Sequence, residues 1–225
     1  MANVGKDIPN ITYGGQEDYK KLYYSDPNAA LKIQVTVSPG WGKLPMGTAL
    51  CMNDSAAGND GKYLPYDPTA TITGAEDAPG RAYLVQDSGT TATILYVTLD
   101  DSYKFTTGDD VIINDDTTTA ENLGAITAID RTTYQHMAAI TVTTATGGTS
   151  FTTARFAYIT VEGYDTCDGI LEKSVDTGTG STAAGALATL IISNAVLYNG
   201  MLTNVDSNAR TDLSATVNGQ YLIVK

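Results

Sequence analysis

Adjacent aspartates are the side chains of this sequence with the clearest capacity for chemistry. Three pairs occur, at residues 100–101, 109–110 and 115–116. Carboxylate oxygens are the ligands that Ca²⁺ prefers, and two opposed carboxylates can hydrolyse a glycosidic bond. The spacing matches no EF-hand, however, and each pair falls at a predicted turn, where neighbouring side chains usually point apart. We therefore predict solvated loops at these pairs and no metal site.

The one histidine and the two cysteines form no recognisable catalytic or metal-binding set. His136 would need a nucleophile and an orienting carboxylate to act in catalysis, and its place before a predicted strand favours a solvated or capping role. Cys51 and Cys167 lack the close spacing of a zinc site. They are two reduced, buried thiols or a disulfide, and the sequence leaves both open. The single tryptophan, Trp41, and the few aromatic residues within 92–161 predict no platform for stacking sugar rings.

Sequence motifs of the common enzyme classes are also missing. The chain has no nucleophile elbow, zinc-protease motif, phosphate-binding loop or dinucleotide fingerprint. We therefore predict a protein that is not an enzyme and uses no cofactor.

The charge balance narrows the class of partner. There are 13 basic and 25 acidic residues, a net charge of −12. Binding to nucleic acid or to anionic lipid would need a basic surface instead. A soluble acidic surface is the simplest interpretation, and a basic protein partner is the more specific one.

No targeting or membrane-spanning segment is recognised. The first ten residues have no basic region followed by an apolar run, as a signal peptide would. The longest apolar stretch, residues 187–198, is too short to cross a bilayer. The sequence thus predicts a protein made and used in a cytoplasm, or in an assembly formed there.

Composition predicts a mainly β fold. The chain has 225 residues, 34 of them threonine, and 22 glycines against 7 prolines. Threonine is β-branched and favours strands, and glycine suits the tight turns between them. This length allows one or two domains, each able to bury a core without metals or disulfides.

Apolar residues that alternate with polar ones mark the strands. Residues 31–38 show a clean period of two, which ends at a proline and a glycine. The middle of the chain carries short strands at regular spacing, which suggests a small antiparallel barrel. These expected strands are residues 91–99, 111–113, 123–129, 138–144 and 156–161.

The C-terminal part combines strands with one short helix. Residues 188–198 fit a helix or a strand by periodicity, and their β-branched content with the following turn favours a strand. Residues 204–215 predict a helix that begins at Asp206 or Ser207 as its cap. Residues 221–224 predict a closing strand.

Residues 1–30 show no persistent helical or strand period, which is typical of an arm. Tyrosine gives such an arm contact area at low entropic cost when it docks. A frayed tail that packs on its own domain is the alternative. The residues expected to contact a partner are Ile11, Tyr13, Tyr19, Tyr23 and Tyr24.

Two segments resemble the head decoration proteins of lambda-like tailed phages. One runs from the small and apolar residues 47–50, through a polar loop, to Gly61-Lys62-Tyr63-Leu64-Pro65-Tyr66-Asp67. The family's next strand has a glycine, an apolar residue and a leucine, which residues 80–84 or 168–171 could supply. Residues 190–202 could match the strand and turn that follow. The resemblance covers about a third of the chain.

The resemblance implies a virion protein that binds the outer surface of the head and stabilises it against internal DNA pressure. Its β-rich core would comprise residues 31–91 and 162–225, with an inserted small β-barrel at 92–161 and an extended arm at 1–30. The family implies a homotrimer whose partner is the major capsid protein, with no catalysis.

Other classes fit the same composition. A phage tail, fibre or adhesin module that binds a host surface would show an exposed aromatic or Ca²⁺ site in the middle unit. A secreted hydrolase would need a signal peptide. A generic β domain is the third alternative, because fold analogy alone does not establish function.

Overall fold

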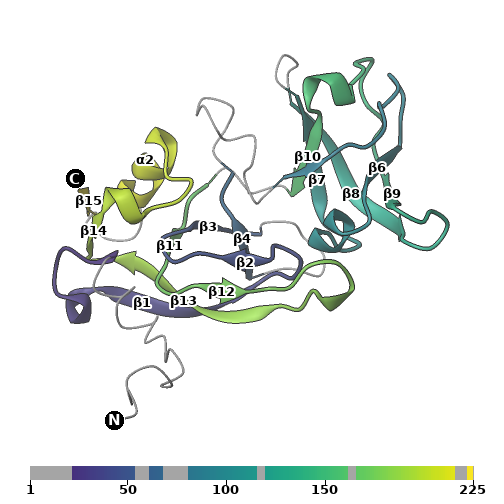
Figure 1. Cartoon of the computed structure of the whole chain (residues 1–225). Coiled ribbons are helices and arrows are strands. Elements are labelled where there is room, and N and C mark those ends of the chain that lie inside the picture. The colour runs from purple at the N-terminus through teal and green to yellow at the C-terminus, as the bar shows by residue number, and fades with distance from the viewer. Residues whose placement is uncertain are drawn as a thin grey trace, which may run out of the picture.

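The fold has two halves, and one of them is a closed five-stranded barrel (Figure 1). The computed structural model describes residues 22–53, 61–67, 81–115, 120–161, 166–215 and 222–224. The barrel order is β1-β13-β11-β3-β4, and a short parallel pairing of β1 with β4 closes it. Its strands are β1 (Leu31–Val37), β3 (Ala49–Met52), β4 (Lys62–Pro65), β11 (Gly169–Leu171) and β13 (Ala186–Ser193).

A six-stranded antiparallel sheet forms the second half, in the order β5-β10-β7-β8-β9-β6. A bridge between Leu84 and Val97 brings its two edges together, so the sheet nearly closes into a barrel. All six strands lie in the chain between β4 and β11, and the first of them precedes the expected boundary at residue 92. They are β5 (Ala82–Tyr83), β6 (Ile94–Thr98), β7 (Asp110–Asn114), β8 (Glu121–Asp130), β9 (Met137–Val142) and β10 (Tyr158–Val161).

Smaller elements flank the two barrels. Strand β2 (Lys43–Leu44) pairs with β12 (Val175–Asp176), and β14 (Val196–Tyr198) runs parallel to β15 (Leu222–Val224). The helix α2 (Ser207–Ala215) follows β14. Short 3₁₀ turns are η1 (Pro27–Ala29), η3 (Asp101–Lys104), η4 (Thr153–Arg155), η5 (Gly180–Thr182) and η6 (Asn199–Met201).

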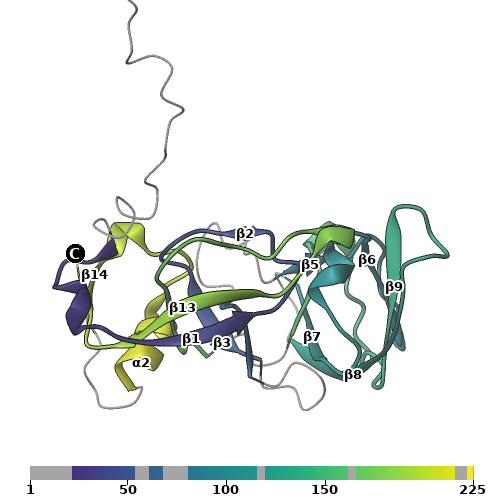
Figure 2. The same cartoon turned by 90° about the horizontal axis from the view of Figure 1, so that it is seen from below.

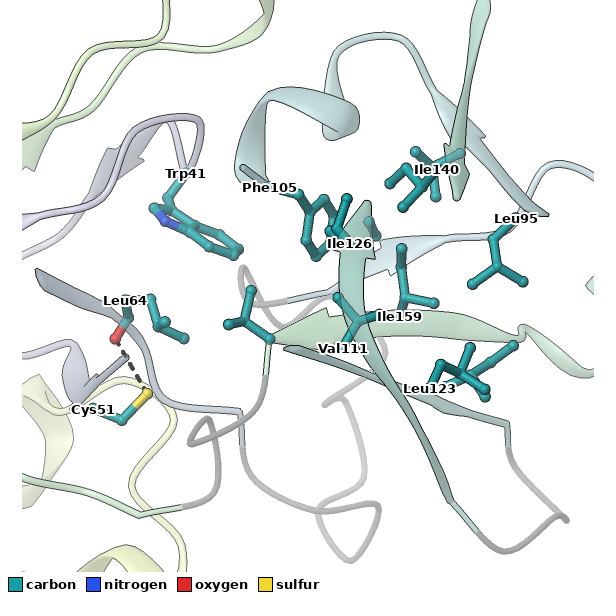
Figure 3. Packing of buried hydrophobic residues seen from close by; sticks show 14 of the residues in the cluster. Trp41, Cys51, Leu64, Leu95, Phe105, Val111, Leu123, Ile126, Ile140 and Ile159 are labelled. Atoms are coloured by element: carbon teal, nitrogen blue, oxygen red, sulfur yellow. Dashed lines mark hydrogen bonds between the residues drawn. The ribbon is translucent and has the colours of Figure 1, made fainter. Parts of the chain in front are cut away.

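One hydrophobic core runs through both barrels. Val35 and Leu64 of the five-stranded barrel belong to the same buried cluster as Ile140 of the six-stranded sheet. At the junction, Trp41 points toward Phe105 (Figure 3), and the two are 5% and 1% exposed. The two barrels are therefore packed against each other through apolar side chains.

A second core lies between the five-stranded barrel and the elements that cover it. It joins Ile170 and Ile191 of the barrel to Leu197 of β14 and Leu213 of α2. Leu22 is fully buried in it. The first described residues of the chain thus pack on the protein's own barrel, and residues 1–21 lie outside the described part.

The mainly β class predicted from composition is confirmed. The strand expected at 31–38 is β1, and the apolar segment 188–198 is the pair β13 and β14, separated at Asn194, whose φ is +56°. The expected helix is α2, and the Asp206 carboxylate caps it by accepting a hydrogen bond from the Ala209 amide at 2.8 Å. None of the helices in the described ranges is long and apolar enough to cross a bilayer.

Candidate binding surfaces

The acidic pairs do not gather into a site. The expectation of solvated loops is wrong for Asp109, which is fully buried. Its carboxylate accepts hydrogen bonds from the Thr106 amide at 2.7 Å and from the Asn53 side chain at 3.3 Å. This aspartate shapes its own turn and ties it to the end of β3, which is why it leaves solvent.

The other pairs face separate partners. The Asp101 carboxylate lies 2.7 Å from the Lys104 ammonium. The expectation of a solvated loop is also wrong for Asp115, which is buried and lies 3.8 Å from the Arg155 guanidinium. Asp116 lies outside the described residues. Within the described ranges, no three His, Cys, Asp or Glu side chains are placed to hold a metal ion.

Neither Cys51 nor Cys167 forms a disulfide, and both are buried. The Cys51 thiol donates to the Leu64 carbonyl (Figure 3), and the Cys167 thiol donates to the Gly169 carbonyl. Burial raises the pKa of Cys167 well above its ordinary value. A buried thiol in this state is a poor nucleophile, so Cys167 serves as apolar core. Cys51 is fully buried and belongs to the core that runs through both barrels.

A buried ion pair lies where the chain passes from one barrel to the other. The Arg81 guanidinium donates to the Asp67 carboxylate at 2.9 Å, and the two side chains are 5% and 0% exposed. Arg81 also stacks over the Tyr158 ring at 4.2 Å. Desolvation raises the pKa of Asp67 despite the neighbouring guanidinium. The pair connects the end of β4 with the start of β5.

The first exposed surface is the tyrosine surface, which we define as Tyr24 and Tyr198. The two rings meet edge to face with centroids 5.4 Å apart. They are 62% and 38% exposed. The Tyr24 amide donates a hydrogen bond to the Val196 carbonyl at 2.8 Å, which fixes this segment against β14.

The other predicted partner-binding tyrosine within the described residues points inward. Tyr23 is 5% exposed, forms a bridge with Leu197, and its hydroxyl donates to the Glu172 carboxylate at 3.1 Å. Ile11, Tyr13 and Tyr19 lie outside the described residues. Of the expected contact residues, Tyr24 is therefore the one whose ring is shown to be exposed.

The second exposed surface is an open depression of about 380 Å³ on the six-stranded sheet. The residues that line it are Val85, Tyr134, Gln135, His136 and Met137. His136 is exposed, as its position before β9 suggested. The sequence carries no local signal for the depression, because Tyr134 stands alone in a polar turn and its neighbour Tyr96 comes from another strand.

The two surfaces lie at opposite ends of the molecule. In both views α2 and β14 lie at one end of the five-stranded barrel and the six-stranded sheet lies at the other (Figures 1 and 2). The tyrosine surface belongs to the β14 end, and the depression belongs to the β6 and β9 end.

Comparison with known families, curated proteins and solved structures finds no match. No family model matches the chain, and no curated protein or solved structure is significantly similar to it.

Proposed function

We propose that the chain is a non-catalytic decoration protein that binds the outer surface of a tailed-phage head through the major capsid protein. The exposed tyrosine surface carries this proposal, because Tyr24 lies close in sequence to residues 1–21, which are expected to contact the capsid. Tyrosine is well suited to such contacts, since its rigid ring gives large contact area at low entropic cost. The short resemblance described above supports the same assignment.

Residues 1–21 would add main-chain hydrogen bonds to the capsid. A segment that pairs with an exposed sheet edge gains affinity with little demand on its sequence. Ile11, Tyr13 and Tyr19 would supply side-chain contacts beside Tyr24. In a trimer, three such segments would bind together and turn weak individual contacts into a long-lived complex.

The arrangement of the barrels supports an outward position for the six-stranded sheet. If the β14 end faces the capsid, the opposite end points away from it (Figure 1). The protein would then reside on the outer surface of the virion after assembly in the host cytoplasm. The acidic charge of −12 suits a basic protein surface beneath it.

Co-sedimentation with phage heads prepared without the protein tests the proposal. The deletion should remove residues 1–21 only, because Leu22 and Tyr23 are buried in the core. We expect the intact chain to bind near-stoichiometrically and the shortened chain to lose binding. Tyr24→Ser should weaken binding by about tenfold, the loss of one exposed aromatic contact. Tyr134→Ser, at the opposite end, is the matched control and should bind normally.

Two results would refute the proposal. One is that the intact chain does not sediment with heads, and the other is that the Tyr24 and Tyr134 variants bind equally well. Failure of the intact chain to sediment with heads would favour the second candidate function, a tail, fibre or adhesin module that binds a host surface. The depression on the six-stranded sheet favours that candidate, because it offers a half-buried aromatic residue, Tyr134, in the middle unit.

A further inference from the structure

The loop that carries most of the depression is held in place before any ligand arrives. The Asp130 carboxylate accepts hydrogen bonds from the Thr132 amide at 2.9 Å and from the Thr133 amide at 3.0 Å. Hydrogen bonding from the Thr133 side chain, together with these amide bonds, lowers the pKa of Asp130, so it stays ionised and keeps them. At the far end of the loop, the His136 carbonyl accepts from the Leu99 amide at 3.1 Å.

Arg131 anchors the same loop to the rest of the sheet. Its guanidinium donates to the Ser102 carbonyl at 2.7 Å and to the Phe105 carbonyl at 3.1 Å, and it stacks over the Tyr103 ring at 4.5 Å. A loop fixed at both ends loses little conformational freedom when a ligand binds. The depression is therefore preformed.

One aromatic ring in the depression is also oriented. Tyr134 meets Tyr96 edge to face, with centroids 5.6 Å apart and an interplanar angle of 86°. The neighbouring Tyr96 phenol raises the pKa of Tyr134. The Tyr134 ring is thus held by a neighbour from β6.

The lining combines apolar side chains with hydrogen-bonding ones and contains no acidic or basic residue of the Asp, Glu, Lys or Arg type. Val85 and Met137 are apolar, whereas Gln135 and His136 offer hydrogen-bond donors and acceptors. None of the five lining residues is Asp, Glu, Lys or Arg, although the chain carries 38 such residues in all. An anionic ligand would find no cationic partner here and a repulsive net charge of −12. A cationic ligand would find no carboxylate in the lining.

We propose that this depression binds a neutral sugar ring. Such a ring has an apolar C–H face that can lie on an aromatic side chain and apolar neighbours, and hydroxyl groups that can reach an amide and an imidazole. The volume of about 380 Å³ lies at the small end of the range for ligand pockets, which suits one or two sugar units. The proposal stands independently of capsid binding, because it depends on the other end of the molecule.

Saturation-transfer NMR on the full-length chain tests this inference. The probes are glucose, galactose, mannose and N-acetylglucosamine, each at about 20 mM, because single sugars on open sites are expected to bind with dissociation constants on the order of millimolar. We expect transfer to at least one of them. Tyr134→Ala and Gln135→Glu should each weaken that binding by about tenfold or more. Tyr24→Ala, an exposed tyrosine at the opposite end, should leave it unchanged.

Circular dichroism would establish that the variants are folded. Gln135 is exposed, so its substitution keeps the test valid if Tyr134→Ala does not fold. Three results would overturn the inference: no transfer to any neutral sugar, equal or stronger transfer to N-acetylneuraminic acid, or equal transfer to cyclohexanol. The last would indicate an apolar pocket without preference for sugars. Loss of capsid binding alone would not bear on the result.

Discussion

Replacing Gly40 by alanine should weaken the packing between the two barrels. The structure allows the loss in the free energy of unfolding to be estimated. Gly40 has φ +92°, and a Cβ atom there would lie 2.5 Å from the Tyr103 carbonyl oxygen and 2.7 Å from the Lys104 amide nitrogen. These are backbone atoms of η3, on the six-stranded side of the junction. The backbone must therefore move until the separation reaches an ordinary contact distance, 3.4 Å or more.

Gly148 provides a matched control. Its φ is +89°, and no heavy atom of the described residues lies within 4 Å of a Cβ built there. Alanine at either position incurs the strain of a left-handed backbone, about 1–2 kcal/mol. Only at Gly40 is a steric term added, about 1–3 kcal/mol for overpacking a tight contact. We expect Gly40→Ala to lower the free energy of unfolding by about 2–5 kcal/mol and Gly148→Ala by about 1–2 kcal/mol.

Thermal and urea unfolding measure the difference. For a chain of this size, 1 kcal/mol shifts Tm by about 2–4 °C, so the two variants should differ by about 2–12 °C. Trp41 is the only tryptophan, and it is buried at the junction, so its fluorescence reports on the contact between the barrels. Circular dichroism reports on both barrels together. In Gly40→Ala, the fluorescence transition should come at lower urea than the circular dichroism transition if the junction opens first. Equal stability of the two variants would refute the reasoning.

Three further predictions concern the buried ion pair, a buried phenol and a strained residue. Arg81→Met should lower the free energy of unfolding by about 3–5 kcal/mol, because it leaves the Asp67 carboxylate buried without its partner. The exposed Lys43→Met should change it by under about 0.5 kcal/mol, and equal effects in urea unfolding would contradict the argument. Burial and a hydrogen bond to a carboxylate raise the pKa of Tyr66 above its ordinary value. The contribution of the Tyr66 phenol to stability is therefore present below about pH 10 and is lost as pH rises further. Unfolding measured between about pH 9 and 11 should therefore show a steeper alkaline loss in the wild type than in Tyr66→Phe. Phe156 is 60% exposed with φ +53°. Because glycine adopts this backbone conformation without strain, Phe156→Gly should be about 1 kcal/mol more stable than Phe156→Ala. Calorimetry that finds the alanine variant more stable would show that the backbone there is not strained.

Local patterns in the sequence predicted most strands but not how they close. The period of two at residues 31–38 and the β-branched run at 188–198 each identify a strand from its neighbours alone. Closure of the five-stranded barrel depends on the pairing of Thr36 with Lys62 and Val37 with Tyr63. Two residue pairs joined in parallel leave no local signal, because parallel partners are distant in sequence.

The candidate surfaces show the same limit. The sequence predicts Tyr24 at a contact surface because tyrosine gives an irregular terminal segment contact area at low entropic cost. Its neighbour Tyr23 is buried because its backbone pairs with Leu197, a contact between residues far apart in the chain. Asp109 belongs to an acidic pair that looks solvated, and its burial depends on Asn53 from the other barrel. Side chains whose partners come from a distant strand are the ones that sequence patterns misplace.

The packed junction gives the two exposed surfaces a fixed relation to each other. Trp41 and Phe105 are buried at the junction, and the Lys104 ammonium lies 5.7 Å from the centroid of the Trp41 ring. The Asn53–Asp109 hydrogen bond and the Asp67–Arg81 ion pair cross the same boundary. Such buried hydrogen bonds and ion pairs favour one arrangement of the two barrels, because a buried polar group that loses its partner destabilises the fold. A protein anchored at the β14 end would therefore present the depression on β6 and β9 in a constant direction, which a flexible tether between two domains would not provide.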